Sequence, residues 1–124
     1  MSKLRSMASI KVEYGGKDGS SKKYFLMLGI PGRKHRLNIG EIFVDRNEVT
    51  HSFMEERFRG LGLGKKLYGE VLKIEKVLYP DSIGGLTPES RRVWDSMKKR
   101  YPMTYGKRWL ANSYERWGGV KFKN

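Results

Sequence analysis

The chain has 124 residues, a formal net charge of +13 and no cysteine, which predicts one domain and excludes a disulfide framework or a thiolate zinc site. No apolar run approaches membrane-span length and the N-terminus lacks the apolar core of a signal peptide, so we expect a cytoplasmic protein without membrane insertion. Because lysine and arginine are in such excess, we expect an anionic macromolecular partner, such as RNA, a DNA-associated protein or an acidic protein.

Four strands are predicted in the first half of the chain, after a basic N-terminus (residues 1–8) that we expect to be flexible. Alternating and apolar residues place these strands at 9–14, 23–29, 35–45 and 48–54, with a short hairpin turn at Arg46-Asn47. In the third strand, Leu37, Ile39 and Phe43 fall on one face and Ile42 and Val44 on the other. Apolar residues on both faces indicate a strand that is covered on both sides.

A helix is predicted at 63–78. It has one apolar stripe at three- and four-residue steps, formed by Leu63, Leu67, Val71, Ile74 and Leu78. Tyr79-Pro80 is expected to end this helix, since proline disfavours helix in the residue before it.

A short strand at 82–86 and a second helix follow. Thr87-Pro88-Glu89 is a typical helix start, with a capping threonine, a proline and an acid in the first turn. The helix is expected to run to about residue 100 with Val93, Trp94 and Met97 on its buried side. A right-handed crossover would make the 48–54 and 82–86 strands parallel.

The last segment, 103–124, alternates basic with aromatic residues. This composition suits stacking on bases and contact with phosphates. It equally suits closing strands whose aromatic residues complete the core. We expect the aromatic residues to close the core and some of the charges to contact a substrate.

The connection between the 48–54 strand and the first helix is rich in glycine: Arg59-Gly60-Leu61-Gly62-Leu63-Gly64-Lys65-Lys66. A strand, a glycine turn and a helix N-terminus form an anion site, because the first helical amides have no internal partner and glycines admit a phosphate closely. Two lysines in the first helical turn oppose the helix dipole unless an anion lies there. The spacing fits neither a P-loop nor the dinucleotide fingerprint.

The pattern Arg59-x-x-Gly62-x-Gly64 resembles motif A of the GCN5-related N-acetyltransferases (the GNAT family), in which this loop holds the pyrophosphate of coenzyme A. The preceding run from Met54 to Arg59 is similar to that family's V-x-P-x-Y-R-G segment, and the likeness covers about residues 39–101. It implies one acyltransferase-like domain over 1–124 with a mixed α/β fold. A central, mostly antiparallel twisted sheet would carry a parallel strand pair splayed at the cofactor site, with helices packed on it.

The resemblance also implies acetyl-CoA as co-substrate and no metal. Carried over residue by residue, the end of the strand would hold the pantetheine arm with Phe53, Met54 and Glu55. The loop amides would hold the pyrophosphate, and they belong to Arg59, Gly60, Leu61, Gly62, Leu63, Gly64 and Lys65.

Acetyl transfer to an amine needs a base and benefits from a proton donor for the leaving thiolate. Glu48 is the first choice as base, with Thr50 and Ser52 on its face by alternation. His51 would share the other face with Val49 and Phe53, which is typical of a core histidine, unless a bulge turns it outward. Glu41 is a third option.

The proton donor is harder to assign. Trp94 stands where the family often has a tyrosine, and it has no proton to give at neutral pH. Tyr101, Tyr105 or solvent would have to replace that tyrosine.

The sequence thus predicts an N-acetyltransferase. The family's N-terminal helices, which wall the acceptor groove, have no counterpart here, so the groove would be open. That favours a macromolecular acceptor: a protein lysine, a protein N-terminus or an amine linked to RNA. Trp94 favours the alternative, a catalytically inactive basic module with the same fold that binds nucleic acid or a protein.

Overall fold

The computed structural model describes residues 8–15, 21–29, 32, 34–80, 87–110 and 113–123, with the backbone alone at 14, 106–110 and 113–117. The fold is mixed α+β. Its elements are β1 (Ala8–Gly15), β2 (Ser21–Gly29), β3 (Arg36–Asp45), β4 (Glu48–Met54), the short 3-10 helix η1 (Glu56–Phe58), α2 (Leu63–Glu75), β5 (Val77–Leu78), α3 (Pro88–Arg100), β6 (Met103–Leu110) and β7 (Ser113–Lys121).

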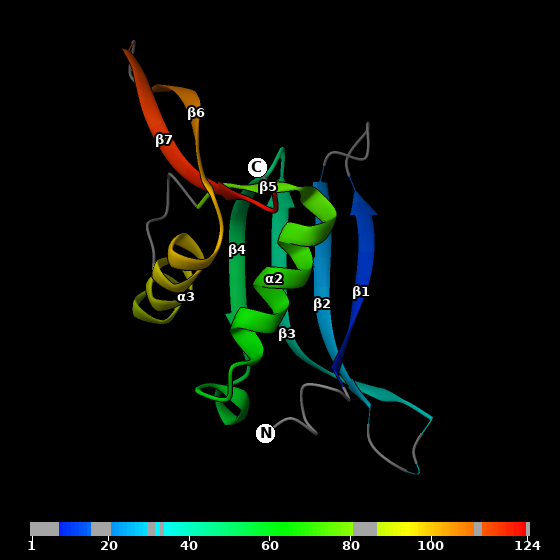
Figure 1. The fold of residues 1–124 in the computed structure, drawn as a ribbon. Helices are drawn as coiled ribbons and strands as arrows, with labels where there is room; N and C mark the ends of the chain where they lie inside the picture. Colours follow the sequence, from blue (N-terminus) through cyan, green and yellow to red (C-terminus); the bar gives the residue numbers. More distant parts are fainter. Residues whose placement is uncertain are drawn as a thin grey trace.

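Two sheets and two helices make up the fold (Figure 1). The first sheet is antiparallel in the order β1-β2-β3-β4, and the second has the order β5-β7-β6. Helix α2 crosses one face of the first sheet, and α3 lies beside its β4 edge. The predicted strands and helices are confirmed where the chain is described, although Ala8 is a buried residue of β1 rather than part of a flexible N-terminus.

The core lies between α2 and the first sheet. The helix buries apolar side chains on one side. Alternate residues of the middle strands pack against these side chains, so water is excluded from both surfaces. The fully buried members are Tyr24, Leu26, Ile39, Ile42, Val44, Leu63, Leu67, Val71, Leu72, Leu78, Trp94 and Val120.

A β-bulge in β3 changes which side chains face this core. The pairing passes from Leu26–Gly40 to Met27–Asn38, so Ile39 is an extra residue. Ile39 is therefore buried on the same side as Ile42, and the prediction that it shares a face with Phe43 is wrong. Phe43 is only partly buried. Among the described elements none covers its face of the sheet, which contradicts the expectation of a strand covered on both sides.

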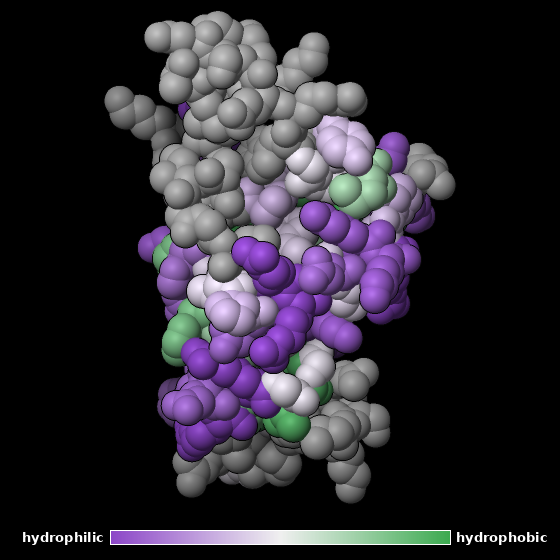
Figure 2. Space-filling model, turned by 90° about the vertical axis from the view of Figure 1, so that its left-hand side faces the viewer, coloured by the Kyte–Doolittle hydropathy of each residue, from purple (hydrophilic) through white to green (hydrophobic). Residues whose placement is uncertain are grey.

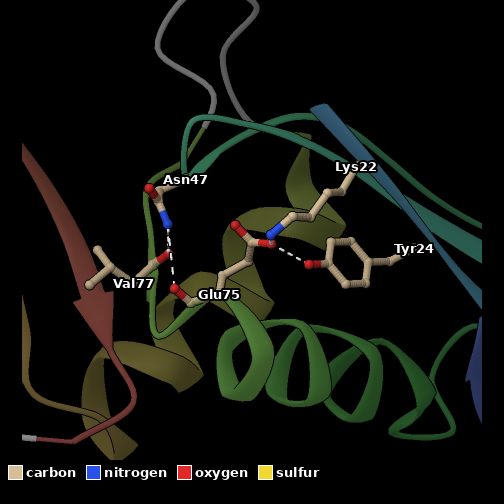
Figure 3. A network of polar contacts seen from close by, with 5 residues as sticks. All are labelled: Lys22, Tyr24, Asn47, Glu75 and Val77. Carbon is tan, nitrogen blue, oxygen red and sulfur yellow. Dashed lines mark hydrogen bonds and ion pairs between the residues drawn. The ribbon is translucent and has the colours of Figure 1, made fainter. Parts of the chain in front are cut away.

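Helix α2 ends at Glu75, three residues earlier than predicted. Lys76 has a φ of 73° and closes the helix, and Val77–Leu78 is a strand. The Asn47 side-chain amide donates to the carbonyl oxygens of Val77 (3.1 Å) and Glu75 (3.4 Å) (Figure 3). Ile74, expected in the apolar stripe, is 44% exposed.

The Glu75 carboxylate is held at the same place by two residues of β2 (Figure 3). Lys22 Nζ lies 2.9 Å from Glu75 Oε2, and the Tyr24 hydroxyl donates to the same oxygen. A carboxylate at a helix C-terminus is unfavourable to the helix dipole. These two partners offset that cost and fix the end of α2 over the sheet.

After β5 the chain runs beside the start of β4. The Tyr79 N–H donates to Asn47 O (2.7 Å) and the Val49 N–H donates to Tyr79 O (2.9 Å), which makes a parallel bridge between Glu48 and Tyr79. The strand predicted at 82–86 lies outside the described residues. Among the described strands, β4 is the last in its sheet.

The Arg46-Asn47 turn and the start of the second helix agree with the prediction. Arg46 and Asn47 both have positive φ (50° and 68°), as a tight hairpin turn requires. The Thr87 Oγ1 accepts a hydrogen bond from the Ser90 N–H (3.2 Å) and caps α3. No helix in the described part of the chain is long and apolar enough to cross a membrane.

Candidate functional site

The glycine-rich loop is fastened to the end of β4 by its first arginine. The Arg59 Nε donates to the Met54 carbonyl oxygen (2.8 Å), and its guanidinium lies over the Phe53 ring at 5.7 Å. The Glu55 N–H donates to Ile39 O (2.8 Å), which continues the contact between β3 and the chain after β4. These bonds hold the entry to the loop in one place.

Two glycines give the loop its shape. Gly60 and Gly62 both have a φ of 78°, a conformation that residues with a Cβ rarely adopt. Gly62 is the N-cap of α2. The chain therefore turns sharply into the helix, and the two glycines place no side chain of their own at its first amides.

The N-terminus of α2 has no cap of its own. No side chain of the described residues caps it, no acid lies in its first turn, and its first helical hydrogen bond runs from the Lys66 N–H to Gly62 O (3.2 Å). The N–H groups of Leu63, Gly64 and Lys65 precede this bond and have no acceptor within the helix. In α3, by contrast, a threonine side chain accepts from a first-turn amide and an acid lies in the first turn. The start of α2 is thus suited to bind an anion.

A pocket of about 560 Å³ opens beside this helix end. Such a volume is in the range that binds cofactor-sized ligands. Its walls come from β3 and β4, the loop, and the first turns of α2 and α3. The lining residues are Glu41, Ile42, Ser52, Phe53, Met54, Arg59, Gly60, Gly62, Gly64, Lys65, Leu67, Tyr68, Thr87, Glu89, Ser90, Arg92 and Val93.

The charged residues gather toward the helix starts. Arg59, Lys65 and Arg92 supply three cations around the pocket, and Glu41 and Glu89 supply two acids. The arginines and Lys65 are exposed, so an anion entering from solvent can meet them without a large desolvation cost.

The inner wall of the pocket contains a buried hydroxyl. Tyr68 is only 4% exposed, and its oxygen has no hydrogen-bond partner within normal geometry in the described structure. Burial raises the pKa of Tyr68 above its ordinary value, and the nearby Ser52 and Trp94 side chains oppose that rise. The indole N–H of Trp94 is buried as well, and it has no hydrogen-bond acceptor among the described residues.

Seven of the ten predicted cofactor residues line this pocket: Phe53, Met54, Arg59, Gly60, Gly62, Gly64 and Lys65. The other three lie behind it. Glu55 gives its amide to β3, Leu61 packs against the core, and Leu63 is fully buried.

The candidate bases are separated by a second bulge. The pairing passes from Val44–Val49 to Phe43–His51, which leaves Thr50 as the extra residue. The prediction that His51 shares a face with Val49 is therefore wrong, and so is the grouping of Ser52 with Glu48. His51 is exposed, and its Nε2 lies 3.0 Å from Glu41 Oε2.

Glu41 is the one candidate base among the described lining residues. Glu48 lies at the far end of β4, at the bridge to Tyr79. His51 is on the opposite face of the strand, with its ring 4.6 Å from that of Phe43.

Neither tyrosine proposed as the acid lies at the pocket. Tyr101 follows α3 directly, and its ring packs 6.3 Å from that of Phe122. Tyr105 is a largely exposed residue of β6. Trp94 is buried instead, edge to face with Tyr68, with ring centroids 5.6 Å apart.

Sequence reasoning missed Ser52, Tyr68 and Arg92 as members of the site. A signal exists for Tyr68, because it lies four residues after Gly64 and so on the same side of the helix as the loop glycine. Ser52 was hidden by the bulge, which no sequence pattern predicts. Arg92 had no distinguishing signal.

Comparison of the chain with protein-family models, with curated proteins and with solved structures found no match. The function of the site is therefore inferred from its own geometry.

Proposed function

We propose that the protein is an N-acetyltransferase that moves an acetyl group from acetyl-CoA to an amine. The observation that carries this proposal is the uncapped start of α2, where the first helical amides have no acceptor in the helix and Gly62, Gly64 and Lys65 line a pocket. A diphosphate matches such a group of donors, and the helix dipole adds to the attraction.

The rest of the pocket suits the remainder of coenzyme A. Arg59, Lys65 and Arg92 provide charge for its phosphates, while Leu67 and Val93 provide apolar walls for its arm. Since β4 is the last strand of its sheet among the described elements, its backbone groups past residue 50 would bond the amides of pantetheine. Among the described residues, β4 is bridged to the chain after β5 at Glu48 and Tyr79, near the start of the strand. The parallel bridge also favours the splayed pair implied by the resemblance.

Proton removal from the amine is best assigned to Glu41. Glu41 is among the residues that line the pocket, and its Oε2 lies 3.0 Å from His51 Nε2 on the opposite, open face of the sheet, so the acceptor amine would approach the carboxylate from that face. A carboxylate paired with an exposed imidazole can take a proton from an acceptor and pass it to solvent.

The acceptor is proposed to be an amine on a macromolecule. Figure 2 views the protein from the side of α3, where hydrophilic residues cover much of the coloured surface. Helix α3 exposes five cations there: Arg91, Arg92, Lys98, Lys99 and Arg100. A surface of this kind repels small cationic amines and attracts an RNA or an acidic protein that carries the amine.

Ligand-dependent thermal unfolding tests this proposal. Acetyl-CoA and CoA at 100 times Kd are expected to stabilise the protein by about 2.7 kcal/mol, a rise of several degrees in Tm, whereas ATP and NAD at the same concentration give little. Release of free CoA thiol with peptides, amines and charged tRNA then identifies the acceptor. No rise with CoA, or an equal rise with ATP, contradicts the proposal.

The second candidate is a basic binding module without turnover. It is favoured by Trp94, which stands where an acid was expected and packs as a core residue. A CoA-dependent rise in Tm without thiol release from any acceptor, together with retention on RNA, would support this function instead.

A further inference from the structure

The open face of the first sheet, on the side away from α2, has two cross-strand rows of side chains at its middle. Directly opposed residues of an antiparallel pair share one face of the sheet. The first row joins Lys11, Phe25, Glu41 and Phe53, and the second joins Glu13, Lys23, Phe43 and His51. Both rows lie between the two bulges, so the pairing is regular within them. Among the described elements none covers this face.

Apart from lysine and glutamate, these rows contain only aromatic residues. The Phe25 and Phe43 rings meet edge to face with centroids 6.4 Å apart, and the His51 ring lies 4.6 Å from that of Phe43. Phe53 is 49% exposed, and the other two phenylalanines are partly buried. The opposite face of the same strands buries mainly aliphatic side chains under α2. Aliphatic side chains pack a core, whereas accessible rings are suited to stacking on a flat ligand.

A single strand of nucleic acid has both groups that this side of the molecule can bind. Each of its bases has a π-face that stacks on an aromatic ring, and its phosphates need cations. Cations gather at the β4 end of the rows. The Arg59 guanidinium lies 5.7 Å from the centre of the Phe53 ring, and α3, with its exposed arginines and lysines, lies beside the same edge (Figure 1). A strand that crosses the rows toward β4 would place bases on the rings and its backbone along these cations.

The lysines at the other end of the rows already have partners within them. Lys11 Nζ lies 3.4 Å from a carboxylate oxygen of Glu13, and Lys23 Nζ lies over the Phe43 ring at 5.0 Å. The charge that a polyanion would meet is therefore concentrated toward α3.

An acid within the rows favours RNA over DNA. Glu41 lies between Phe25 and Phe53 in its row, and its carboxylate is partly exposed. A carboxylate repels phosphate but accepts hydrogen bonds, and the 2′-hydroxyl of ribose can donate one. Deoxyribose has no such group.

We propose that the open face of the first sheet is a stacking platform for single-stranded RNA, formed by Phe25, Phe43, Phe53 and His51. In choosing RNA over an acidic protein, this inference rests on the macromolecular acceptor proposed above. RNA held there would carry its amine to the face from which Glu41 is approached. The binding itself requires no acetyl-CoA, so it can be measured separately from the acetyltransferase function.

The double change Phe25→Leu and Phe43→Leu is the test. It removes two rings, keeps apolar side chains and leaves the lining of the acetyl-CoA pocket intact. Affinity would be measured by fluorescence anisotropy with a labelled single-stranded RNA of about 10 nucleotides, within the usual site sizes. We expect a loss of about 10-fold or more, because each stacked base adds several-fold to affinity. The slope of log affinity against log salt should stay at the wild-type value, because no charge has changed.

Tyr105→Leu is the matched control. Tyr105 is a 57% exposed ring on β6, which belongs to the second sheet, so its loss should leave RNA affinity unchanged. The thermal unfolding of each variant shows whether it is folded. If the double variant does not fold, Phe53→Leu replaces it, because this side chain is about half exposed, and an affinity loss of about 5-fold or more is expected.

Other ligands separate the outcomes. Poly-glutamate has charge without bases, so it should bind the wild type and the double variant equally. Wild-type affinity for single-stranded RNA in the folded ring variants, a loss confined to Tyr105→Leu, or an equal loss for poly-glutamate overturns the platform. Single-stranded DNA that binds as tightly as RNA overturns the choice of RNA. Failure of the wild type to bind acetyl-CoA, with RNA binding and its ring dependence intact, contradicts the acetyltransferase function and supports the platform.

Discussion

Gly62 is the residue on which the anion site depends most. Its φ of 78° and its position as the N-cap of α2 place it at the open amides. A side chain there would strain the backbone and occupy the position proposed for the phosphate. Gly62→Leu should therefore weaken CoA binding by 10-fold or more, measured by calorimetry.

Gly32 provides a matched control for the backbone strain. It also has a φ of 78°, and an added Cβ would meet no atom within 4 Å. Gly32→Leu should lose a similar amount of stability, about 1–2 kcal/mol for a left-handed residue with a side chain, and bind CoA normally. Equal CoA affinity in the two variants would contradict the role given to Gly62.

At the residue level, the sequence predicted the loop but not the inner wall of the pocket. The glycine spacing from Arg59 to Gly64 is local, so it can be read directly. The bulge at Thr50 leaves no mark on the alternation of β4, and it moves His51 outward and Ser52 inward. Tyr68 was overlooked because an aromatic residue beside Leu67 resembles an ordinary core position.

At the level of elements, the end of α2 is fixed by residues from far along the chain. Glu75 has a side chain that is 5% exposed and binds Lys22 and Tyr24 (Figure 3). Glu75→Gln keeps the shape but removes the charge. We expect it to lower the free energy of unfolding by about 1.5–3 kcal/mol, the usual contribution of hydrogen bonds to charged groups, measured by urea denaturation.

The exposed pair of Lys11 and Glu13 is the control for that change. The two charged atoms are 3.4 Å apart and the side chains are 61% and 51% exposed. Such pairs contribute about 0–1 kcal/mol, so Glu13→Gln should change stability little. Similar losses in both variants would show that burial of the Glu75 carboxylate has no special effect.

The difference between local signals and contacts from distant residues explains which elements the sequence predicts. The hairpin turn at Arg46-Asn47 and the Thr87-Pro88 start of α3 follow from local residues, and both were confirmed. The end of α2 was predicted at Tyr79-Pro80, because proline is the strongest local stop. Asn47 and β2 instead fix the end of the helix before that proline. They are 28 or more residues away in sequence, so a local pattern does not contain them.

For the whole molecule, the net charge of +13 predicts salt-dependent binding to a polyanion. The triple change Lys98→Gln, Lys99→Gln and Arg100→Gln removes three exposed cations from one end of α3. On single-stranded RNA it should lower the slope of log affinity against log salt by up to about 2, because each phosphate that a cation neutralises adds about 0.7 to that slope.

A control with the same change of charge uses other surfaces. Lys11→Gln, Lys23→Gln and Lys34→Gln change three exposed lysines far from α3 in sequence. The slope of log affinity against log salt for this control variant should stay near that of the wild type. If both triple variants lose affinity equally, the binding depends on overall charge and not on the α3 surface.

The most direct measurement of the central claim is the response of the loop amides to coenzyme A in a 15N-labelled sample. Titration with CoA is expected to shift the N–H resonances of Gly62, Gly64 and Lys65 the most, because a diphosphate would accept hydrogen bonds from the open start of α2. If these resonances stay in place while CoA reaches saturation, or if CoA does not bind, the pyrophosphate site and the acetyltransferase function are both contradicted.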